Sequence, residues 1–187
     1  ERMSVRILAP AADEQPDSSL SYMFDQLLGR IGDANSGHDI VDGELRVSAL
    51  LGALERATQA RRPVALCGTA FSFVHLIDAL KREATPRMEL PEGSRIMETG
   101  GFKGKSREMS RLDLYHSLES SLGIPPTRIV NQYGMTELGS QFYDSVLRHP
   151  GQPRRKFAPP WTRMRFLDPE TGQEAAAGQL GIVVVHD

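Results

Sequence analysis

Two spacings of apolar residues alternate along the first two thirds of the chain. Short continuous apolar runs are typical of buried strands, whereas apolar residues three and four positions apart are typical of amphipathic helices. The runs predict strands at residues 5–8, 63–68, 95–97 and 128–132. The helical stripes predict helices from residue 17 or 18 to 31, from 47 to about 61, from about 73 to 82, and from 106 or 110 to 122. A polar loop is expected at residues 33–42.

Strands that alternate with helices at this spacing favour parallel pairing through right-handed crossovers. We therefore predict an α/β fold: a parallel sheet with helices on both faces. The pattern changes after residue 148, because residues 149–161 are rich in Pro and Gly, and two apolar runs at 164–167 and 181–185 then flank a turn. This predicts a β-ribbon from a second sheet or barrel, and a division into an α/β subdomain at 1–148 and a ribbon segment at 149–187.

Three of the predicted strands end in short polar or glycine-containing segments, namely 68–70, 99–101 and 133–136. Ligands of open parallel sheets bind outside the carboxyl ends of the strands, so these segments are expected to converge on one site. Gly100 and Gly101 would let the backbone approach a ligand closely, although a simple tight turn also explains them.

The most informative stretch is Tyr133-Gly134-Met135-Thr136-Glu137, which directly follows the last predicted strand of the sheet. It offers an aromatic face for stacking, a close backbone approach, a hydroxyl for a phosphate and a carboxylate for a hard cation. An alternative, compatible reading makes Thr136 the N-cap of a following helix with Glu137 in its first turn.

These five residues resemble the Tyr-Gly-x-Thr-Glu signature of the adenylate-forming superfamily, which includes acyl-CoA synthetases, peptide-synthetase adenylation domains and luciferases. Together, residues 97–105 and 133–141 are similar to the acyl-protein synthetases, the fatty-acid-activating component of bacterial bioluminescence. The resemblance extends over most of the chain, including residues 17–20 and 159–161. It implies part of the large domain of a ligase that uses ATP and Mg²⁺ to form an acyl-adenylate and passes the acyl group to a protein thiol.

The resemblance also implies roles for single residues. Thr136 would donate to the α-phosphate, and Glu137 would hold the Mg²⁺ that bridges phosphate oxygens; these two are the predicted catalytic residues. The predicted nucleotide contacts are Gly100, Gly101, Asn131, Gln132, Tyr133, Gly134, Met135 and Thr136. Phe71 and His75 are candidates for the acyl pocket. The implied partners are a carboxylic acid substrate and an acyl-acceptor protein or reductase.

Three alternatives of other kinds remain open. Residues 100–106 resemble a phosphate-binding loop of a kinase or other nucleotidase, but the loop is one residue short of that motif. The acceptor could be coenzyme A, as in an arylacetate-type acyl-CoA ligase, or the segment could be a binding module without chemistry. Cys67 lies within an apolar strand, so a buried structural thiol is favoured over an acyl-carrying nucleophile.

Composition narrows the class of protein further. The 187 residues carry a formal net charge of −2, which gives no electrostatic argument for nucleic acid. One cysteine and five dispersed histidines argue against a zinc site, and apolar runs stay far below the length of a membrane span. We therefore expect a cytoplasmic protein, with the basic residues 154–156 in a solvated loop. The superfamily's upstream phosphate loop, ribose-binding Asp and C-terminal lysine domain are not recognisable, so the chain is expected to be part of a longer protein.

Overall fold

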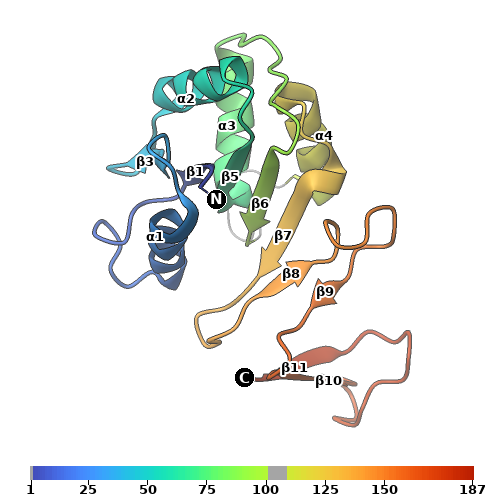
Figure 1. The fold of residues 1–187 in the computed structure, drawn as a ribbon. Helices are drawn as coiled ribbons and strands as arrows, with labels where there is room; N and C mark the ends of the chain where they lie inside the picture. The colour runs from blue at the N-terminus through green and yellow to red at the C-terminus, as the bar shows by residue number, and fades with distance from the viewer. Residues whose placement is uncertain (1, 101–108) are drawn as a thin grey trace.

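The computed structural model describes residues 2–100 and 109–187, and its centre is a seven-stranded sheet (Figure 1). Five strands run parallel in the order β2-β1-β5-β6-β7, and β8 and β9 extend the sheet by antiparallel pairing. The predicted α/β sheet is confirmed, whereas its antiparallel edge was not predicted. The strands are β1 Ser4–Leu8, β2 Gly37–His38, β5 Val64–Thr69, β6 Arg95–Thr99, β7 Ile129–Tyr133, β8 Phe142–Asp144 and β9 Lys156–Phe157.

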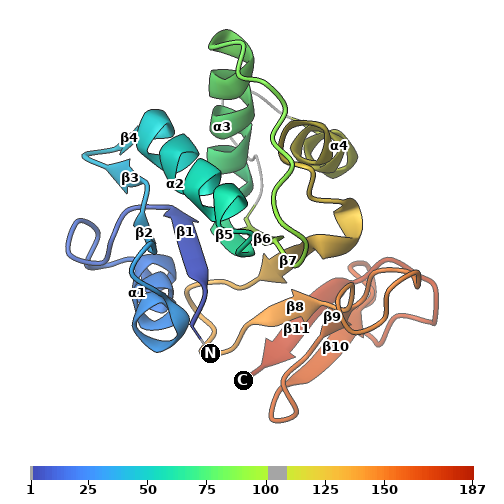
Figure 2. The same ribbon diagram turned by 45° about the horizontal axis from the view of Figure 1, so that its top comes forward.

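Helices cover both faces of this sheet, as predicted (Figure 2). Helix α1 packs on one face, while α2, α3 and α4 pack on the other. The bounds are α1 Ser19–Ile31, α2 Val47–Gln59, α3 Ala70–Arg82 and α4 Arg111–Leu122, with a 3₁₀ turn at Pro126–Arg128. The segment 33–42, which was predicted as a loop, contains strand β2 and strand β3 Ile40–Val41. Strand β3 pairs with β4 Glu44–Leu45 in a small antiparallel hairpin.

The helix ends follow from their local sequence. Ser18 and Ser110 act as N-caps, each accepting a hydrogen bond from a backbone N–H three residues ahead. Helix α4 ends at Gly123, which adopts φ 69°, a left-handed conformation that favours glycine. Leu112 in the first turn of α4 is 64% exposed, whereas the helix buries Leu114, Tyr115, Leu118 and Leu122.

Two apolar clusters hold the layers together, one on each face of the sheet. The larger one joins α2, α3 and α4 to side chains such as Leu66 and Ile96, both fully buried. The smaller one packs Phe24 of α1 against Val5 and Ile7 of β1. Since alternate residues of a strand point to opposite faces, β1, β5 and β6 each contribute to both clusters.

The C-terminal segment forms the predicted antiparallel ribbon, made of β10 Arg163–Leu167 and β11 Ile182–His186. A hydrogen-bonded tie connects it to the loop before β8. Ser140 donates its backbone N–H and its hydroxyl to the two carboxylate oxygens of Asp187, at 2.6 and 2.5 Å. The indole N–H of Trp161 in turn donates to the Ser140 hydroxyl at 2.8 Å. These bonds link the segment after β7 to the end of the ribbon.

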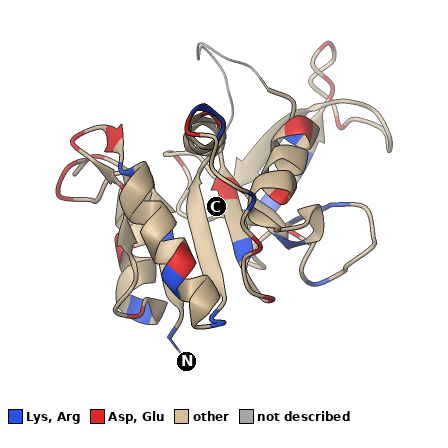
Figure 3. Cartoon of the chain, turned by 90° about the horizontal axis from the view of Figure 1, so that it is seen from above, with Lys and Arg blue, Asp and Glu red and all other residues tan. Residues whose placement is uncertain are grey.

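Acidic and basic positions are interspersed over the helices and loops (Figure 3). No helix in the described part of the chain combines the length and apolar character needed to cross a membrane.

Candidate nucleotide-binding site

The register of the parallel strands brings the three predicted strand ends together. Thr69 of β5 lies opposite Thr99 of β6, and Thr99 lies opposite Gln132 of β7. Gly100, the residue after Thr99, therefore lies beside Tyr133, the residue after Gln132. Its φ of 78° favours glycine, and no described atom lies within 4 Å of the place where a side chain would begin. A side chain at Gly100 would therefore meet none of the described atoms.

The turn after β7 faces solvent. Tyr133 is 42% exposed and its ring meets Phe142 edge-on, with 6.0 Å between the ring centroids. Thr136 and Glu137 are both exposed, in a turn in which the N–H of Leu138 donates to the carbonyl of Met135 at 3.1 Å. The alternative role of Thr136 as a helix N-cap is wrong, because the turn leads into β8 rather than into a helix. The hydroxyl and the carboxylate are therefore available to a ligand.

Gly134 has a steric reason to be glycine. A Cβ at this position would lie 2.6 Å from the side-chain nitrogen of Gln132, well inside contact distance. The Gln132 amide is itself buried and accepts a hydrogen bond from the Thr99 hydroxyl. Gln132, which was predicted to contact the base, therefore links β7 to β6 through this hydrogen bond. Its side chain lies on the face of the sheet opposite to that of Tyr133.

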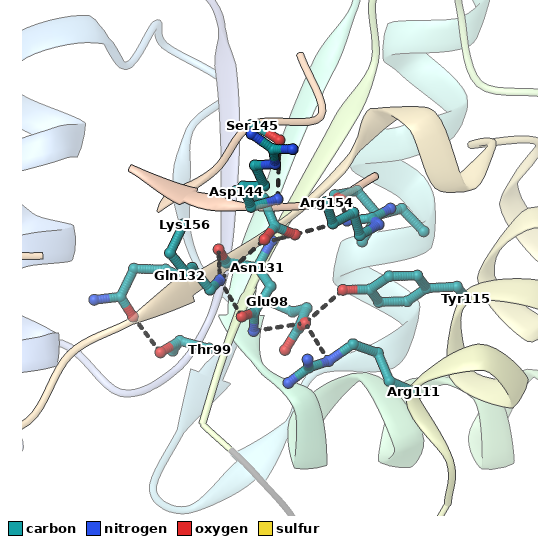
Figure 4. Close-up of polar contacts among 12 residues, drawn as sticks. Glu98, Thr99, Arg111, Tyr115, Asn131, Gln132, Asp144, Ser145, Arg154 and Lys156 are labelled. Carbon is teal, nitrogen blue, oxygen red and sulfur yellow. Dashed lines mark hydrogen bonds and ion pairs between the residues drawn. The ribbon is translucent and has the colours of Figure 1, made fainter. Parts of the chain in front are cut away.

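A buried polar cluster lies on the α4 side of these strands (Figure 4). At its centre is Glu98, which is 1% exposed and whose Oε1 accepts from the Tyr115 hydroxyl at 2.7 Å and from Asn131 Nδ2 at 2.8 Å. Arg111 forms an ion pair with the same oxygen at 3.4 Å. The other oxygen, Oε2, is buried and has no hydrogen-bond partner within the described residues. An unsatisfied buried polar atom costs about 1–3 kcal/mol, so this oxygen calls for an explanation.

Burial and the negative charge of Glu98 both raise the pKa of the Tyr115 hydroxyl above its usual range. The phenol therefore stays protonated and acts as a hydrogen-bond donor to the carboxylate. The guanidinium of Arg154 lies over its ring, 4.9 Å from the centroid.

The cluster continues across the sheet edge through Asp144, whose side chain is 6% exposed. Asp144 accepts from the backbone N–H of Asn131 at 3.1 Å and forms ion pairs with Arg154 at 2.7 Å and Lys156 at 3.1 Å. Burial acts to raise the pKa of Asp144, but these hydrogen bonds together outweigh it and hold the pKa below its usual range. For Lys156, burial lowers the pKa of the ammonium, with the attraction of Asp144 opposing it.

The prediction of a merely solvated loop at residues 154–156 is wrong for two of its three residues. The side chains of Arg154 and Lys156 are only 30% and 31% exposed, and both bind Asp144. Lys156 also donates to both the backbone carbonyl and the side-chain oxygen of Asn131. One signal in the sequence pointed to this cluster, namely an acidic residue, Glu98, directly after the apolar pair Ile96 and Met97. Asp144 on β8 and Lys156 on β9 lie in segments whose sequence does not indicate a buried cluster.

The candidates for the acyl pocket lie on the first turns of α3, beside the strand ends. The rings of Phe71 and His75 pack edge to face with centroids 4.3 Å apart, and Phe73 between them in sequence is fully buried. Cys67 is buried, and burial raises the pKa of its thiol to about 12, which disfavours the nucleophilic thiolate. This agrees with a structural role for the thiol.

Part of the predicted site lies outside the described residues. This concerns Gly101 and all but the first residue of the loop at 100–106 that resembles a phosphate-binding loop.

The described residues contain no cluster of three or more His, Cys, Asp or Glu side chains. Mg²⁺ usually keeps several waters and is held by one or two carboxylates together with the phosphates of the substrate. The single exposed carboxylate of Glu137 fits that kind of site.

Comparison with solved structures shows the same fold in ATP-bound MatB from Rhodopseudomonas palustris, with a TM-score of 0.60, 19% identity, and coverage of 98% of this chain and 31% of that one. The apo form of MatB gives a TM-score of 0.57 at 20% identity. The fold is therefore that of one part of a larger α/β protein. At the level of sequence, the family model "Acyl-protein synthetase, LuxE" matches residues 43–187, and the chain belongs to this family.

Two curated relatives carry the name long-chain-fatty-acid–luciferin-component ligase. The protein of Aliivibrio fischeri is 26% identical over 152 residues, which is 80% of this chain and 37% of the relative. The protein of Vibrio harveyi is 24% identical over 150 residues, which is 79% of this chain and 38% of the relative. The chain thus spans little more than a third of the length of these relatives.

Proposed function

We propose that the protein containing this chain activates a long-chain fatty acid with ATP and transfers the acyl group to a protein thiol. Membership of the acyl-protein synthetase family and the names of the two relatives support the substrate and the reaction type. The observation that carries the proposal for this chain is the exposed Tyr133–Glu137 turn beside Gly100, at the shared edge of three parallel strands. Residues 1–148 hold the nucleotide and the acyl group, and 149–187 lead from this subdomain to the rest of the protein.

The reaction proceeds in two steps. The carboxylate oxygen of the acid attacks the α-phosphorus of ATP, the bond to pyrophosphate breaks, and an acyl-adenylate forms. A thiolate then attacks the acyl carbonyl and AMP leaves, which produces the thioester. The alternative acceptor is the thiol of coenzyme A, and thioester analysis with each acceptor distinguishes the two.

In the first step the residues of this chain position the substrate and stabilise charge. Tyr133 stacks on the base, Gly100 and Gly134 let the backbone approach it, and the Thr136 hydroxyl donates to the α-phosphate. Glu137 holds Mg²⁺, which when bound neutralises charge on the phosphates and the leaving pyrophosphate. Phe71 and His75 line the entrance for the acyl chain.

The test is calorimetry of the chain with AMP and with MgATP. Tyr133→Ala is expected to weaken AMP binding by about 1–3 kcal/mol, the range for stacking of one base on an aromatic ring. The matched control is Phe166→Ala, which removes an exposed aromatic side chain of β10 in the ribbon. Thr136→Val is expected to cost about 1.5–3 kcal/mol, because it removes a hydrogen bond to a charged group.

Glu137→Gln tests the metal contact separately. It is expected to reduce the gain in ATP affinity on adding Mg²⁺ and to leave AMP binding without metal unchanged, whereas Glu170→Gln on the ribbon turn changes neither. Absence of AMP binding by the wild-type chain, or equal binding by Tyr133→Ala, contradicts a nucleotide site here and favours a module without chemistry.

A further inference from the structure

The turn that carries Thr136 and Glu137 has little support of its own. All residues from 133 to 139 are exposed except Leu138, which is partly buried. The N–H of Leu138 donates to the carbonyl of Met135 at 3.1 Å, which closes only the middle of the segment. Because exposed backbone with few hydrogen bonds opens readily, the position of this turn depends on how its two ends are held.

The two ends of the turn are held in different ways. Tyr133 at the start belongs to β7, pairs with Phe142 of β8 and contacts its ring. Ser140 near the end is 7% exposed and is bound by Asp187, which directly follows β11, and by Trp161, which precedes β10. The sheet therefore fixes one side of the turn, and the ribbon fixes the other side at Ser140.

Asp187 holds Ser140 at two points. One carboxylate oxygen accepts from the backbone N–H at 2.6 Å, and the other accepts from the hydroxyl at 2.5 Å. Since the hydroxyl gives its hydrogen to the carboxylate, it presents a lone pair to the indole N–H of Trp161, which donates at 2.8 Å. Two charge-assisted bonds from one carboxylate fix both the position and the orientation of the backbone at Ser140. Glu137 lies only three residues earlier in the chain.

We propose that Asp187 is a positioning residue of the nucleotide site: by holding Ser140, it keeps Thr136 and Glu137 directed at the phosphates. Asp187 itself does not touch the substrate. This inference rests on the proposed function, since it requires Thr136 to bind the α-phosphate. A shift of about 1 Å is enough to impair an oriented contact, so loss of the Asp187 carboxylate weakens the phosphate contact. The base keeps its contact, because Tyr133 lies at the end of the turn that the sheet holds.

Calorimetry with AMP and with adenosine separates the phosphate contact from the base contact. The wild-type chain should bind AMP more tightly than adenosine, since only AMP offers a phosphate to Thr136. Asp187→Ala removes both acceptors of Ser140 and is expected to lower the ratio of the AMP affinity to the adenosine affinity about tenfold, the equivalent of one hydrogen bond to a charged group. A general loss of folded protein removes binding sites for both ligands alike, so it leaves this ratio unchanged.

Asp168→Ala is the matched control, because Asp168 also holds a turn of the ribbon. Its carboxylate accepts from the backbone N–H groups of Glu170 and Thr171 at 2.8 and 3.1 Å. This variant should keep the wild-type ratio of the two affinities. Thermal unfolding of each variant establishes that it is folded.

Asp187→Asn tests whether the side chain acts through its hydrogen bonds. The amide oxygen can accept from the N–H of Ser140, and the NH₂ group can donate to the hydroxyl. The ratio of the two affinities should therefore return most of the way to the wild-type value.

The outcomes separate this role from the proposed function. If the wild-type chain prefers AMP and Asp187→Ala keeps that preference, or if Asp187→Asn or Asp168→Ala lowers the ratio as much as Asp187→Ala, positioning through Ser140 is refuted while the nucleotide site stands. If the wild-type chain binds AMP no more tightly than adenosine, the phosphate contact of Thr136 is refuted, and the positioning role with it. If it binds neither ligand, the proposed function fails for this chain, and the role of Asp187 fails too.

Discussion

The central sheet and the C-terminal ribbon use similar strands and bury them to different extents. Strand β5 reads Val-Ala-Leu-Cys-Gly-Thr and is buried along nearly its whole length. Strand β11 reads Ile-Val-Val-Val-His, is at least as rich in β-branched residues, and is exposed or only partly buried at every position. The difference lies in the neighbours, because β5 is covered by helices on both faces while β11 pairs only with β10. The apolar character of a strand therefore indicates what it can bury, and the layers around it decide what it does bury.

The largest expected effect comes from shortening a buried side chain in the central sheet. Leu66→Ala removes a fully buried side chain of β5 and should lower the free energy of unfolding by about 3 kcal/mol, because it leaves a cavity between sheet and helices. The matched change on the ribbon is Val183→Ala at a side chain that is 45% exposed, with an expected effect below about 0.5 kcal/mol. Urea unfolding followed by circular dichroism measures both. Equal losses would show that the ribbon is as well packed as the sheet.

A smaller effect is expected at the antiparallel edge of the sheet, where ion pairs rather than apolar packing hold the strands. Asp144→Asn removes the carboxylate that binds Arg154 and Lys156 and should cost about 2 kcal/mol at pH 7. Because the pKa of Asp144 is lower in the folded protein than in the unfolded chain, its contribution is present above about pH 4 and is lost as the pH falls through the folded pKa. The difference in stability between wild type and variant should therefore shrink on acidification. A difference that stays constant down to pH 2 contradicts this assignment.

A smaller effect than that of Asp144→Asn is expected at the tie between ribbon and sheet. Trp161→Phe keeps an aromatic ring but removes the indole donor to Ser140, which should cost about 1 kcal/mol, the usual net value of one hydrogen bond. Unfolding is followed by circular dichroism, since the variant lacks the only tryptophan of the chain. Tyr22→Phe, at an exposed position of α1, serves as the control. A loss no greater than that of the control would mean that the Trp161 hydrogen bond does not hold the ribbon in place.

The sequence was sufficient to predict the elements whose signals are local. The strands at 63–68 and 95–97, the helices at 19–31 and 111–122, and the ribbon are present as expected, because apolar spacing and turn residues act within a few positions. The meeting of three strand ends was also predictable, since parallel strands end at the same edge of a sheet.

Features that depend on long-range pairing escaped prediction. Strands β8 and β9 are short, and the sequence predicts a basic loop where β9 lies, because Lys156 meets Asp144 only once both strands lie at the sheet edge. The cluster around Glu98 depends on Tyr115 from α4 and Asn131 from β7, which come together only in the folded chain. In the sequence, only the acidic residue Glu98 within strand β6 indicated this cluster.

The pairing of β1 with β5 also has a consequence for how the chain is made. Ser4 lies opposite Val64, so the first strand cannot meet its main neighbour until that part of the chain has been synthesised. At about 5–20 residues per second, the delay on the ribosome is about 3–12 seconds. During this time the apolar residues of β1 lack most of their native cover, and a nascent chain stalled before Val64 is expected to be cut readily by proteases.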